Sequence, residues 1–227
     1  MKKRIQKIQG RIEAAALRAG REPADVGLVA VSKTHPAEAV REAAAAGLTV
    51  FGENYVQEAR DKIEALSDLD VSWHFIGHLQ SNKAKYAVRW FDLIHSVDSV
   101  KLAREIDKQA AKRDKRQNVL IQVNIADEPT KSGAGQDDLE ALCREAAGFE
   151  NIRIHGLMTM PPFFDEPEKA RPFFAALRRM RDHIAGLGIE GVSMDALSMG
   201  MTGDFEAAVE EGATWVRIGT AIFGARQ

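Results

Sequence analysis

The stretch Val26-Gly-Leu-Val-Ala-Val-Ser-Lys-Thr-His35 sets the pattern from which the fold follows. An apolar, β-rich run leads into a lysine, and a turn with a helical pattern comes next. At the carboxyl end of a buried strand, loss of water lowers the pKa of an amine and frees its lone pair for carbonyl chemistry. Lys33 is therefore a candidate Schiff-base lysine. The alternative is a lysine that reaches solvent or pairs with an acid, and this segment alone favours that alternative.

Strand and helix patterns alternate along the chain, which indicates a parallel sheet. Eight such units, without a Gly-x-Gly-x-x-Gly after the first strand, predict an α/β fold of the (β/α)₈ TIM barrel type rather than a doubly wound sheet. We expect one domain over residues 1–227. The predicted strands are 27–33, 48–52, 71–77, 91–97, 118–125, 152–158, 195–199 and 214–219. The predicted helices are 36–46, 54–66, 79–89, 98–113, 136–148, 167–186 and 203–211.

An extra amino-terminal helix is expected, because Ile5, Ile8, Ile12 and Ala16 fall on one helical face. The basic opening segment lacks the apolar core of a secretory signal, and no stretch is long enough to span a membrane. A formal net charge of −2 provides no overall field that would attract nucleic acid. Cys143 is the only cysteine, which excludes an internal disulfide and fits a reducing cytoplasm.

The ends of the predicted strands are unusually polar. In a barrel of this type, chemistry takes place where strands end and helices begin. Polar groups that converge on one rim suit a small anionic or polar ligand. The polar side chains at these positions are Lys33, Glu53, Asn54, His74, His78, Gln80, Asn124, His155, Ser198, Arg217 and Thr220.

Two neighbouring loops have the composition of a phosphate site. Residues 198–202 lead into a predicted helix, whose free backbone N–H groups and dipole favour an anion. Gly200 and Gly203 let the chain approach a phosphate closely, and Gly219 with Thr220 adds a glycine and a hydroxyl in the next loop. Loops after strands seven and eight commonly bind phosphate in such barrels. Ordinary caps and turns explain either loop taken alone.

Arg217 is predicted to face the barrel interior. Val216 and Ile218 alternate with it and face the outer helices. A buried guanidinium needs a partner. The partner is either a barrel acid such as Glu53 or Asp195, or a ring nitrogen or carboxylate of a ligand.

Four segments, in order over nearly the whole chain, match one family. They are Ala30-Val-Ser-Lys-Thr34, Phe51-Gly-Glu-Asn-Tyr-Val-Gln-Glu58, Trp73-His-Phe-Ile-Gly-His-Leu-Gln-Ser-Asn-Lys83, and Leu197-Ser-Met-Gly-Met-Thr202 with Val216-Arg-Ile-Gly-Thr-Ala-Ile-Phe-Gly224. The chain resembles the pyridoxal 5′-phosphate (PLP) homeostasis proteins, which are single-domain barrels similar to the amino-terminal domain of alanine racemase.

The resemblance implies PLP bound as an internal aldimine on Lys33. It implies that Arg217 lies beside the pyridine nitrogen, where a permanent cation keeps that nitrogen unprotonated and restrains carbanion chemistry. No metal is expected, because the histidine pair at 74 and 78 ends a strand and lacks the helix and glutamate of a zinc motif. The remaining residues implied to bind the cofactor are Asn54 near its ring, and Ser198, Met199, Gly200, Gly219 and Thr220 at its phosphate.

The resemblance also implies a carrier that stores PLP, protects it or hands it to apo-enzymes. Racemases add a second domain that supplies a tyrosine opposite the lysine across a dimer; we expect neither here, and neither Tyr55 nor Tyr86 clearly replaces that tyrosine. A monomer is therefore expected. The alternatives are a weak PLP-dependent racemase and a cofactor-free class I aldolase with Lys33 as nucleophile. Arg217 and the four matching segments weigh against the aldolase.

Overall fold

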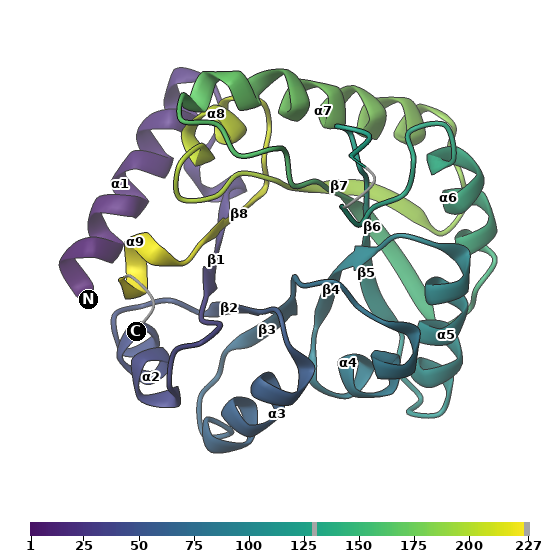
Figure 1. The fold of residues 1–227 in the computed structure, drawn as a ribbon, viewed down its shortest axis with the longest axis horizontal. Helices are drawn as coiled ribbons and strands as arrows, with labels where there is room; N and C mark the ends of the chain where they lie inside the picture. The colour runs from purple at the N-terminus through teal and green to yellow at the C-terminus, as the bar shows by residue number, and fades with distance from the viewer. Residues whose placement is uncertain (129–130, 225–227) are drawn as a thin grey trace.

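The computed structural model describes residues 1–128 and 131–224, and in this part of the chain eight parallel strands close into a barrel in sequence order (Figure 1). The structure confirms the predicted TIM barrel. The predicted domain end at residue 227 lies outside the described residues. The strands are β1 Gly27–Val31, β2 Val50–Glu53, β3 Ser72–Phe75, β4 Leu93–Val97, β5 Gln117–Gln122, β6 Ile152–Met158, β7 Val192–Ser198 and β8 Trp215–Ile218.

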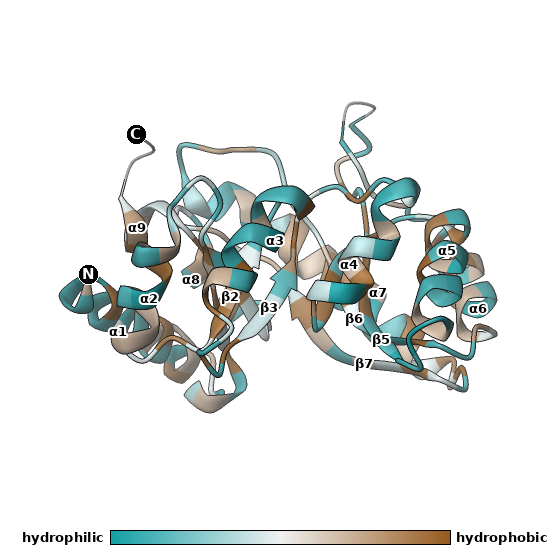
Figure 2. Cartoon of the chain, turned by 90° about the horizontal axis from the view of Figure 1, so that it is seen from below, coloured by the Kyte–Doolittle hydropathy of each residue, from teal (hydrophilic) through white to brown (hydrophobic). Residues whose placement is uncertain are grey.

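Helices surround the barrel. Hydrophilic residues lie mainly on the outward faces of these helices, and hydrophobic residues lie mainly toward the strands (Figure 2). Burial of apolar side chains between these two layers stabilises the fold, at roughly 25 cal/mol per Å². The helices after the strands are α2 Ala37–Ala45, α3 Val56–Ala65, α4 Ala84–Trp90, α5 Val100–Ala111, α6 Leu139–Ala147, α7 Arg171–Gly186, α8 Phe205–Glu210 and α9 Thr220–Phe223. Within the described residues, no helix is long and apolar enough to cross a membrane.

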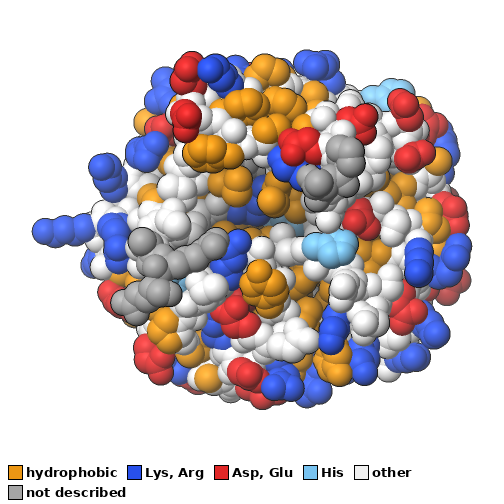
Figure 3. Space-filling view, in the orientation of Figure 1, with side chains coloured by type: hydrophobic (Ala, Val, Ile, Leu, Met, Phe, Trp, Pro, Cys, Tyr) orange, Lys and Arg blue, Asp and Glu red, His pale blue; other side chains and the backbone are white. Residues whose placement is uncertain are grey.

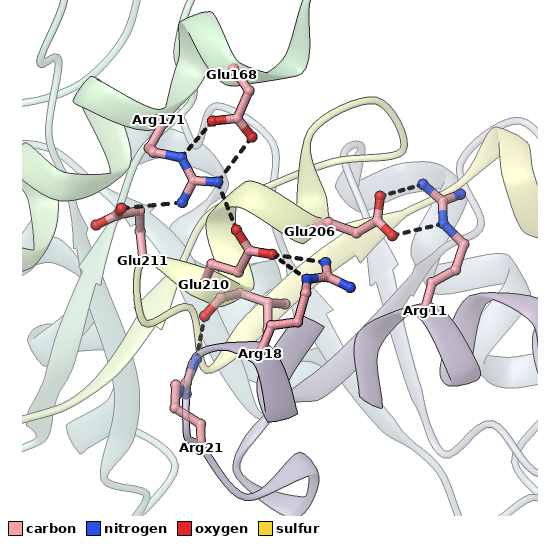
Figure 4. A network of polar contacts seen from close by, with 9 residues as sticks. Arg11, Arg18, Arg21, Glu168, Arg171, Glu206, Glu210 and Glu211 are labelled. Carbon is pink, nitrogen blue, oxygen red and sulfur yellow. Dashed lines mark hydrogen bonds and ion pairs between the residues drawn. The ribbon is translucent and has the colours of Figure 1, made fainter. Parts of the chain in front are cut away.

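The expected extra helix is α1, Lys2–Arg18, which packs against α8. Ile5, Ile8 and Ile12 are buried on its inner face, as their spacing predicts. Figure 4 shows ion pairs that join α1 to α8, among them Arg11 with Glu206 at 2.8 Å. These pairs are partly exposed and each contributes at most about 1 kcal/mol, so the buried isoleucines hold the helix in place.

The barrel interior is filled by side chains. Leu93, Leu120, Met158 and Ala196 form an inner cluster against which Trp215 packs. The first residue of β1 is a glycine whose added Cβ would lie 2.2 Å from the Trp215 ring. A large ring on β8 therefore requires the small residue on β1. Because the interior is a packed core, ligands are restricted to the two mouths of the barrel.

Several predicted boundaries are wrong by a few residues, and three of them lie near the rim. β1 ends at Val31, two residues before Lys33, because the chain turns there. The helix predicted at 79–89 begins as a 3₁₀ turn at Ser81–Lys83, and the one predicted at 203–211 begins at Phe205. The last of these shifts arises because the Asp204 carboxylate accepts a hydrogen bond from the Met201 N–H at 2.6 Å, within the loop before the helix. The short helix α9 was not predicted.

Candidate functional site

Lys33 lies on a tight turn at the carboxyl rim of the barrel and is half-buried. The next residue, Thr34, has a φ of +65°, a conformation that side chains other than glycine rarely adopt. Its N–H donates to the Glu58 carboxylate of α3. Such strain persists only where surrounding contacts fix it. The turn that carries the amine therefore has a defined direction.

A buried ion pair supports this turn from behind. Lys62 of α3 donates to Glu53 at the end of β2 and to the carbonyl of Ser32 at 2.8 Å. The Ser32 hydroxyl donates to the same Glu53 oxygen at 2.7 Å. Burial raises the pKa of Glu53, while the charge of Lys62 and these hydrogen bonds oppose the rise. Sequence reasoning missed Lys62; its i, i+4 spacing from Glu58 in α3 was the available signal.

Asn54 lies next to Lys33 along the rim. Val31 pairs with Gly52 in the β1–β2 register. Lys33 and Asn54 each lie two positions further along, so they are neighbours on adjacent chain segments. The Asn54 Oδ1 is buried and has no hydrogen-bond partner in the described part of the chain. A buried polar atom without a partner costs free energy and is typical of a site that a ligand completes. Asn54 thus fits its predicted place beside a bound ring.

Arg217 faces the barrel interior, as predicted, and is 3% exposed. Its Nη1 donates to the Ser198 hydroxyl at 2.6 Å and its Nη2 to the Thr159 carbonyl at 2.9 Å. Burial lowers the pKa of Arg217 to about 10, so it stays cationic near neutral pH. The structural partners considered from the sequence, Glu53 and Asp195, form no ion pair with it. The acid whose charge acts on it is Asp204, in the loop after β7.

Ser198 ends β7 and joins Arg217 to the barrel interior. Besides accepting from Arg217, its hydroxyl lies 2.8 Å from Nδ1 of His95, which is fully buried on β4. Sequence reasoning missed both His95 and Thr159. The alternation of Leu93 and His95 on an inward face was the signal for the histidine, whereas a backbone carbonyl such as that of Thr159 leaves no trace in the sequence.

The two predicted phosphate loops lie side by side. Gly200 has a φ of +88°, and its added Cβ would be 2.5 Å from Cβ of Ala208, so only glycine fits there. The preceding N–H, that of Met199, donates to the Trp215 carbonyl at 3.1 Å. Thr220 begins α9, and its hydroxyl donates to the Thr202 hydroxyl at 3.3 Å, which joins the loop after β8 to the loop after β7.

Gly219 places the second loop against the first strand. Its added Cβ would lie 3.2 Å from the Val31 carbonyl, so the backbone approaches β1 closely just below the Lys33 turn. Gly203, in contrast, has nothing within 4 Å of an added Cβ, so packing within the protein does not require a glycine there, and its close approach to a phosphate stays a prediction. The candidate site therefore lies on four neighbouring strands, β7, β8, β1 and β2, and on the loops that follow them. It contains the Lys33 amine, the Asn54 amide, Arg217 and the two phosphate loops.

This rim can hold a planar molecule with an anionic tail and a carbonyl group. Figure 3 looks onto the rim, where basic and histidine side chains lie near the centre among hydrophobic ones. Such a molecule could donate a hydrogen bond to the unpartnered Asn54 oxygen and approach the backbone of the glycine-lined loops. Arg217 is a fixed cation beside them. The residues present fit a phosphorylated aromatic aldehyde.

Three other histidines have partners of their own. His155 hydrogen-bonds Asn118 Oδ1 at 2.9 Å, near the opposite end of the barrel. His78 is at the rim and lies 3.0 Å from the Ser132 hydroxyl. His74 points into the barrel, where its Nδ1 lies 3.0 Å from His95 Nε2. Among the described residues, no three His, Cys, Asp or Glu side chains are grouped as a metal site.

Comparison with known proteins places the chain in a family. The family model described as alanine racemase, N-terminal domain, matches residues 4–227. A pyridoxal phosphate homeostasis protein of Pseudomonas aeruginosa is 50% identical over 98% of this chain and 94% of its own. Structures of PipY from Synechococcus elongatus, with and without PLP, are 42% identical over 96% of this chain and 100% of theirs, with TM-scores of 0.84 and 0.85. The chain therefore belongs to the alanine racemase N-terminal domain family, among the pyridoxal phosphate homeostasis proteins.

Proposed function

We propose that this protein binds pyridoxal 5′-phosphate at the carboxyl rim and acts in cofactor homeostasis as a carrier. The observation that carries the proposal is the amine of Lys33 on a fixed turn, between Asn54 and the glycine-lined loops that follow β7 and β8. Relatives of this chain bear the homeostasis name, and PipY has been solved with PLP bound. The bound group would supply an aldehyde, with which the Lys33 amine forms a Schiff base and releases one water.

Each side chain has a separate role in this proposal. Arg217 is held by Ser198 and Thr159 and presents its charge to the pyridine nitrogen, which keeps that nitrogen unprotonated. The Ser198 hydroxyl donates to the phosphate, as do the Thr220 hydroxyl and the backbone N–H groups of the two loops. Asn54 offers its free amide oxygen to the ring side of the site. The cofactor-binding set is then Lys33, Asn54, Ser198, Met199, Gly200, Arg217, Gly219 and Thr220.

A carrier suits this chemistry better than a strong catalyst. A cation at the pyridine nitrogen weakens the ring as an electron sink, and a single lysine serves only one face of a substrate. Tyr55 is 60% exposed and directly precedes α3, and we expect no role for it as a second acid opposite Lys33. We further propose a monomer of one barrel domain in the cytoplasm that meets apo-enzymes transiently. Its buried thiol, Cys143, fits a reducing compartment.

The visible spectrum of the protein with added PLP tests the covalent attachment. The wild-type protein should gain the absorption band of a protonated Schiff base, and Lys33→Ala should lose it entirely. Lys85→Ala, which removes an amine from the outer helix α4, is the matched control and should keep the band. Reduction with borohydride followed by peptide mapping should give a pyridoxyl group on Lys33; the same group on another lysine, or on none, would refute the proposal.

Exchange of the α-proton separates the carrier from the racemase. The loaded protein is incubated with L-alanine in deuterated water, and the α-proton signal is followed by NMR. A carrier leaves that signal nearly unchanged on the timescale of PLP transfer to an apo-enzyme. Rapid exchange that disappears in Lys33→Ala would establish a racemase instead.

A further inference from the structure

A second cavity opens at the amino-terminal mouth of the barrel, at the opposite end from Lys33. It has a volume of about 730 Å³ and is lined by the first residues of several strands, including Gly27, Ser72 and Leu93. This is the size of a small-molecule site. The polar side chains that matter for its chemistry are Asp25, His74, Asp92, Asn118, His155 and Asp195.

The lining carries an excess of negative charge. Asp25 and Asp195 use their carboxylates in no hydrogen bond within the described chain, whereas Asp92 accepts from the Ser72 hydroxyl and the Trp73 N–H. Arg21 also lines the cavity, but its guanidinium is directed to the carbonyls of α8 and the loop after it, at 2.7 and 2.9 Å. Three carboxylates thus share the cavity with one arginine, whose Nη1 already donates to two carbonyls, so the lining carries a net negative charge that favours a cation over an anion.

His74 lines this cavity and is 4% exposed. Its Nδ1 is bonded to His95, and its Nε2 takes part in no hydrogen bond among the described residues. The ring lies edge-on to Trp215, with the ring centroids 5.0 Å apart. A ring nitrogen without a partner, on a side chain that is almost fully buried and lines a cavity, is a position for a hydrogen bond to a ligand.

The same histidine is connected to the phosphate site through the barrel interior. Arg217 donates to Ser198 at 2.6 Å, Ser198 lies 2.8 Å from His95, and His95 lies 3.0 Å from His74. This row of hydrogen bonds joins the carboxyl rim to the amino-terminal cavity. Its four members are Arg217 of β8, Ser198 of β7, His95 of β4 and His74 of β3. Three hydrogen bonds connect them without interruption.

Both histidines are neutral near pH 7. Burial lowers the pKa of His74 to about 4, and burial together with the neighbouring His74 and Arg217 holds the pKa of His95 well below its usual value. A neutral imidazole has one N–H and one accepting nitrogen. In a row of such rings, every hydrogen bond must run in the same direction. The direction of the Ser198 O–H therefore decides which nitrogen of His74 carries the proton.

Two states of the row follow from this rule. When Ser198 donates to His95 Nδ1, His95 donates onward to His74 Nδ1, and His74 presents an N–H to the cavity. When Ser198 donates to a phosphate oxygen, His95 Nδ1–H donates to Ser198, His74 Nδ1–H donates to His95, and His74 presents a bare Nε2. In the change to the phosphate-bound state, the Ser198 proton passes to His95 Nδ1, the His95 Nε2 proton passes to His74 Nδ1, and His74 Nε2 releases a proton to water in the cavity. Ser198 takes up one proton from water or the phosphate monoester at the carboxyl rim, so both rings stay neutral.

We propose that the amino-terminal cavity is a second ligand site for a small ammonium ion with an N–H donor, linked to the phosphate site through His74, His95 and Ser198. The linkage rests on the proposed function, because it requires Ser198 to donate to the phosphate. An ammonium N–H needs the bare Nε2 of His74, which exists only in the phosphate-bound state of the row. Each ligand then raises the affinity for the other by the same factor.

Titration with two cations of equal charge tests this site. Trimethylammonium carries one N–H and forms no Schiff base with PLP, whereas tetramethylammonium has no N–H. We expect trimethylammonium to tighten PLP binding about fivefold, and tetramethylammonium to change it by much less. His74→Gln should abolish the difference while PLP still binds. Equal effects of both cations, or no effect of either on a protein that binds PLP normally, would overturn the inference and leave the proposed function intact.

The tautomers of the histidines provide an independent readout in the wild-type protein. In ¹⁵N NMR spectra, the Nε2 of His74, assigned with His74→Gln, should change from the protonated to the unprotonated type when PLP binds. Inorganic phosphate should produce the same change on the protein without PLP. A His74 tautomer that is the same in all states would overturn the linkage, and absence of the PLP absorption band would instead refute the proposed function.

Discussion

The two mouths of the barrel are built differently. At the carboxyl rim, the buried charged side chains are hydrogen-bonded before any ligand arrives, as in Lys62 with Glu53 and Arg217 with Ser198, and a threonine is held at a φ of +65°. At the amino-terminal mouth, Asp195 has no hydrogen bond within the described residues, and the left-handed positions include Asp114 in the loop before β5 and glycines such as Gly47 that follow helices. Left-handed residues thus occur at both mouths. The comparison teaches that buried charge is concentrated where the site must be rigid.

Replacement of one lysine at each end should show the largest difference. Lys62→Met leaves the buried carboxylate of Glu53 without its cation and should lower the free energy of unfolding by about 3–5 kcal/mol. Near the amino-terminal mouth, Lys115→Met removes two hydrogen bonds to carbonyls but leaves no unpaired charge, and should cost about 1 kcal/mol. Urea denaturation at pH 7 measures both values.

The double variant Glu53→Leu/Lys62→Met is the control for this interpretation. With both charges removed, most of the lost stability should return. In Lys62→Met alone, Glu53 should take up a proton as the pH falls, because burial already raises its pKa, so the loss should be smaller at pH 5 than at pH 8. A loss that is equal at both pH values and persists in the double variant would mean that packing, rather than charge, is responsible.

The histidine row between the two mouths should make stability depend on pH. The pKa of His74 is about 4 in the folded protein, against roughly 6.5 in an unfolded chain. The unfolded state therefore binds more protons between these values, so stability is fully present above pH 6.5 and is lost as the pH falls toward 4. The contribution of this residue is about 3 kcal/mol.

Comparison of His74→Gln with the wild type isolates this contribution. The variant should lose about 3 kcal/mol less stability than the wild type between pH 6.5 and 4, measured by thermal and urea unfolding. His183→Gln, at an exposed position on α7, is the control and should follow the wild type. A wild-type-like fall in His74→Gln would contradict a neutral, buried His74.

The fold could be predicted from the sequence because its signals are local. Strand and helix alternation gave the barrel, and the spacing of Ile5, Ile8 and Ile12 gave the amino-terminal helix. The inward direction of Arg217 followed from alternation along one strand. The predicted end of β1 and the predicted start of α8 were wrong, because a side-chain contact acts at each place. Lys62 donates to the Ser32 carbonyl just after β1, and Asp204 accepts from the Met201 N–H just before α8.

The polar network behind the site could not be predicted in the same way. His95 meets Ser198 across the barrel, 103 positions away in the chain, and Arg217 meets the carbonyl of Thr159 across 58 positions. Such contacts depend on closure of the barrel and on the rotation of each strand. The sequence left either a barrel acid or a ligand atom as the partner of Arg217, whereas the structure satisfies it with a hydroxyl and a carbonyl, which preserves its charge for a ligand.

A pair of glycines in one loop should sharpen the contrast between rigid and open parts of the rim. Gly200→Ala places a Cβ 2.5 Å from Ala208 at a φ of +88° and should cost about 2 kcal/mol, with weaker PLP binding as the loop shifts. Gly203→Ala has nothing within 4 Å and should change stability by less than about 0.5 kcal/mol. Urea unfolding and the visible PLP titration report the two effects. Similar losses in both variants would mean that the whole loop, rather than one position, is constrained.

The smallest difference is expected between two aspartates, one at each mouth. Asp204→Ala removes the acceptor of the Met201 N–H in the phosphate loop and should cost about 1 kcal/mol, whereas Asp195→Ala removes no hydrogen bond and should stay within about 0.5 kcal/mol.

The two aspartate variants should also differ in ligand binding. Asp204→Ala releases an N–H for the phosphate and removes a nearby negative charge, so PLP binding should be kept or tightened even though the fold is weaker. Asp195→Ala should leave PLP binding alone and weaken only the effect of trimethylammonium, since its carboxylate faces the other cavity. Lower stability with equal or tighter PLP binding in Asp204→Ala, and neither change in Asp195→Ala, would show that the anion site at the carboxyl rim is built at a cost in stability.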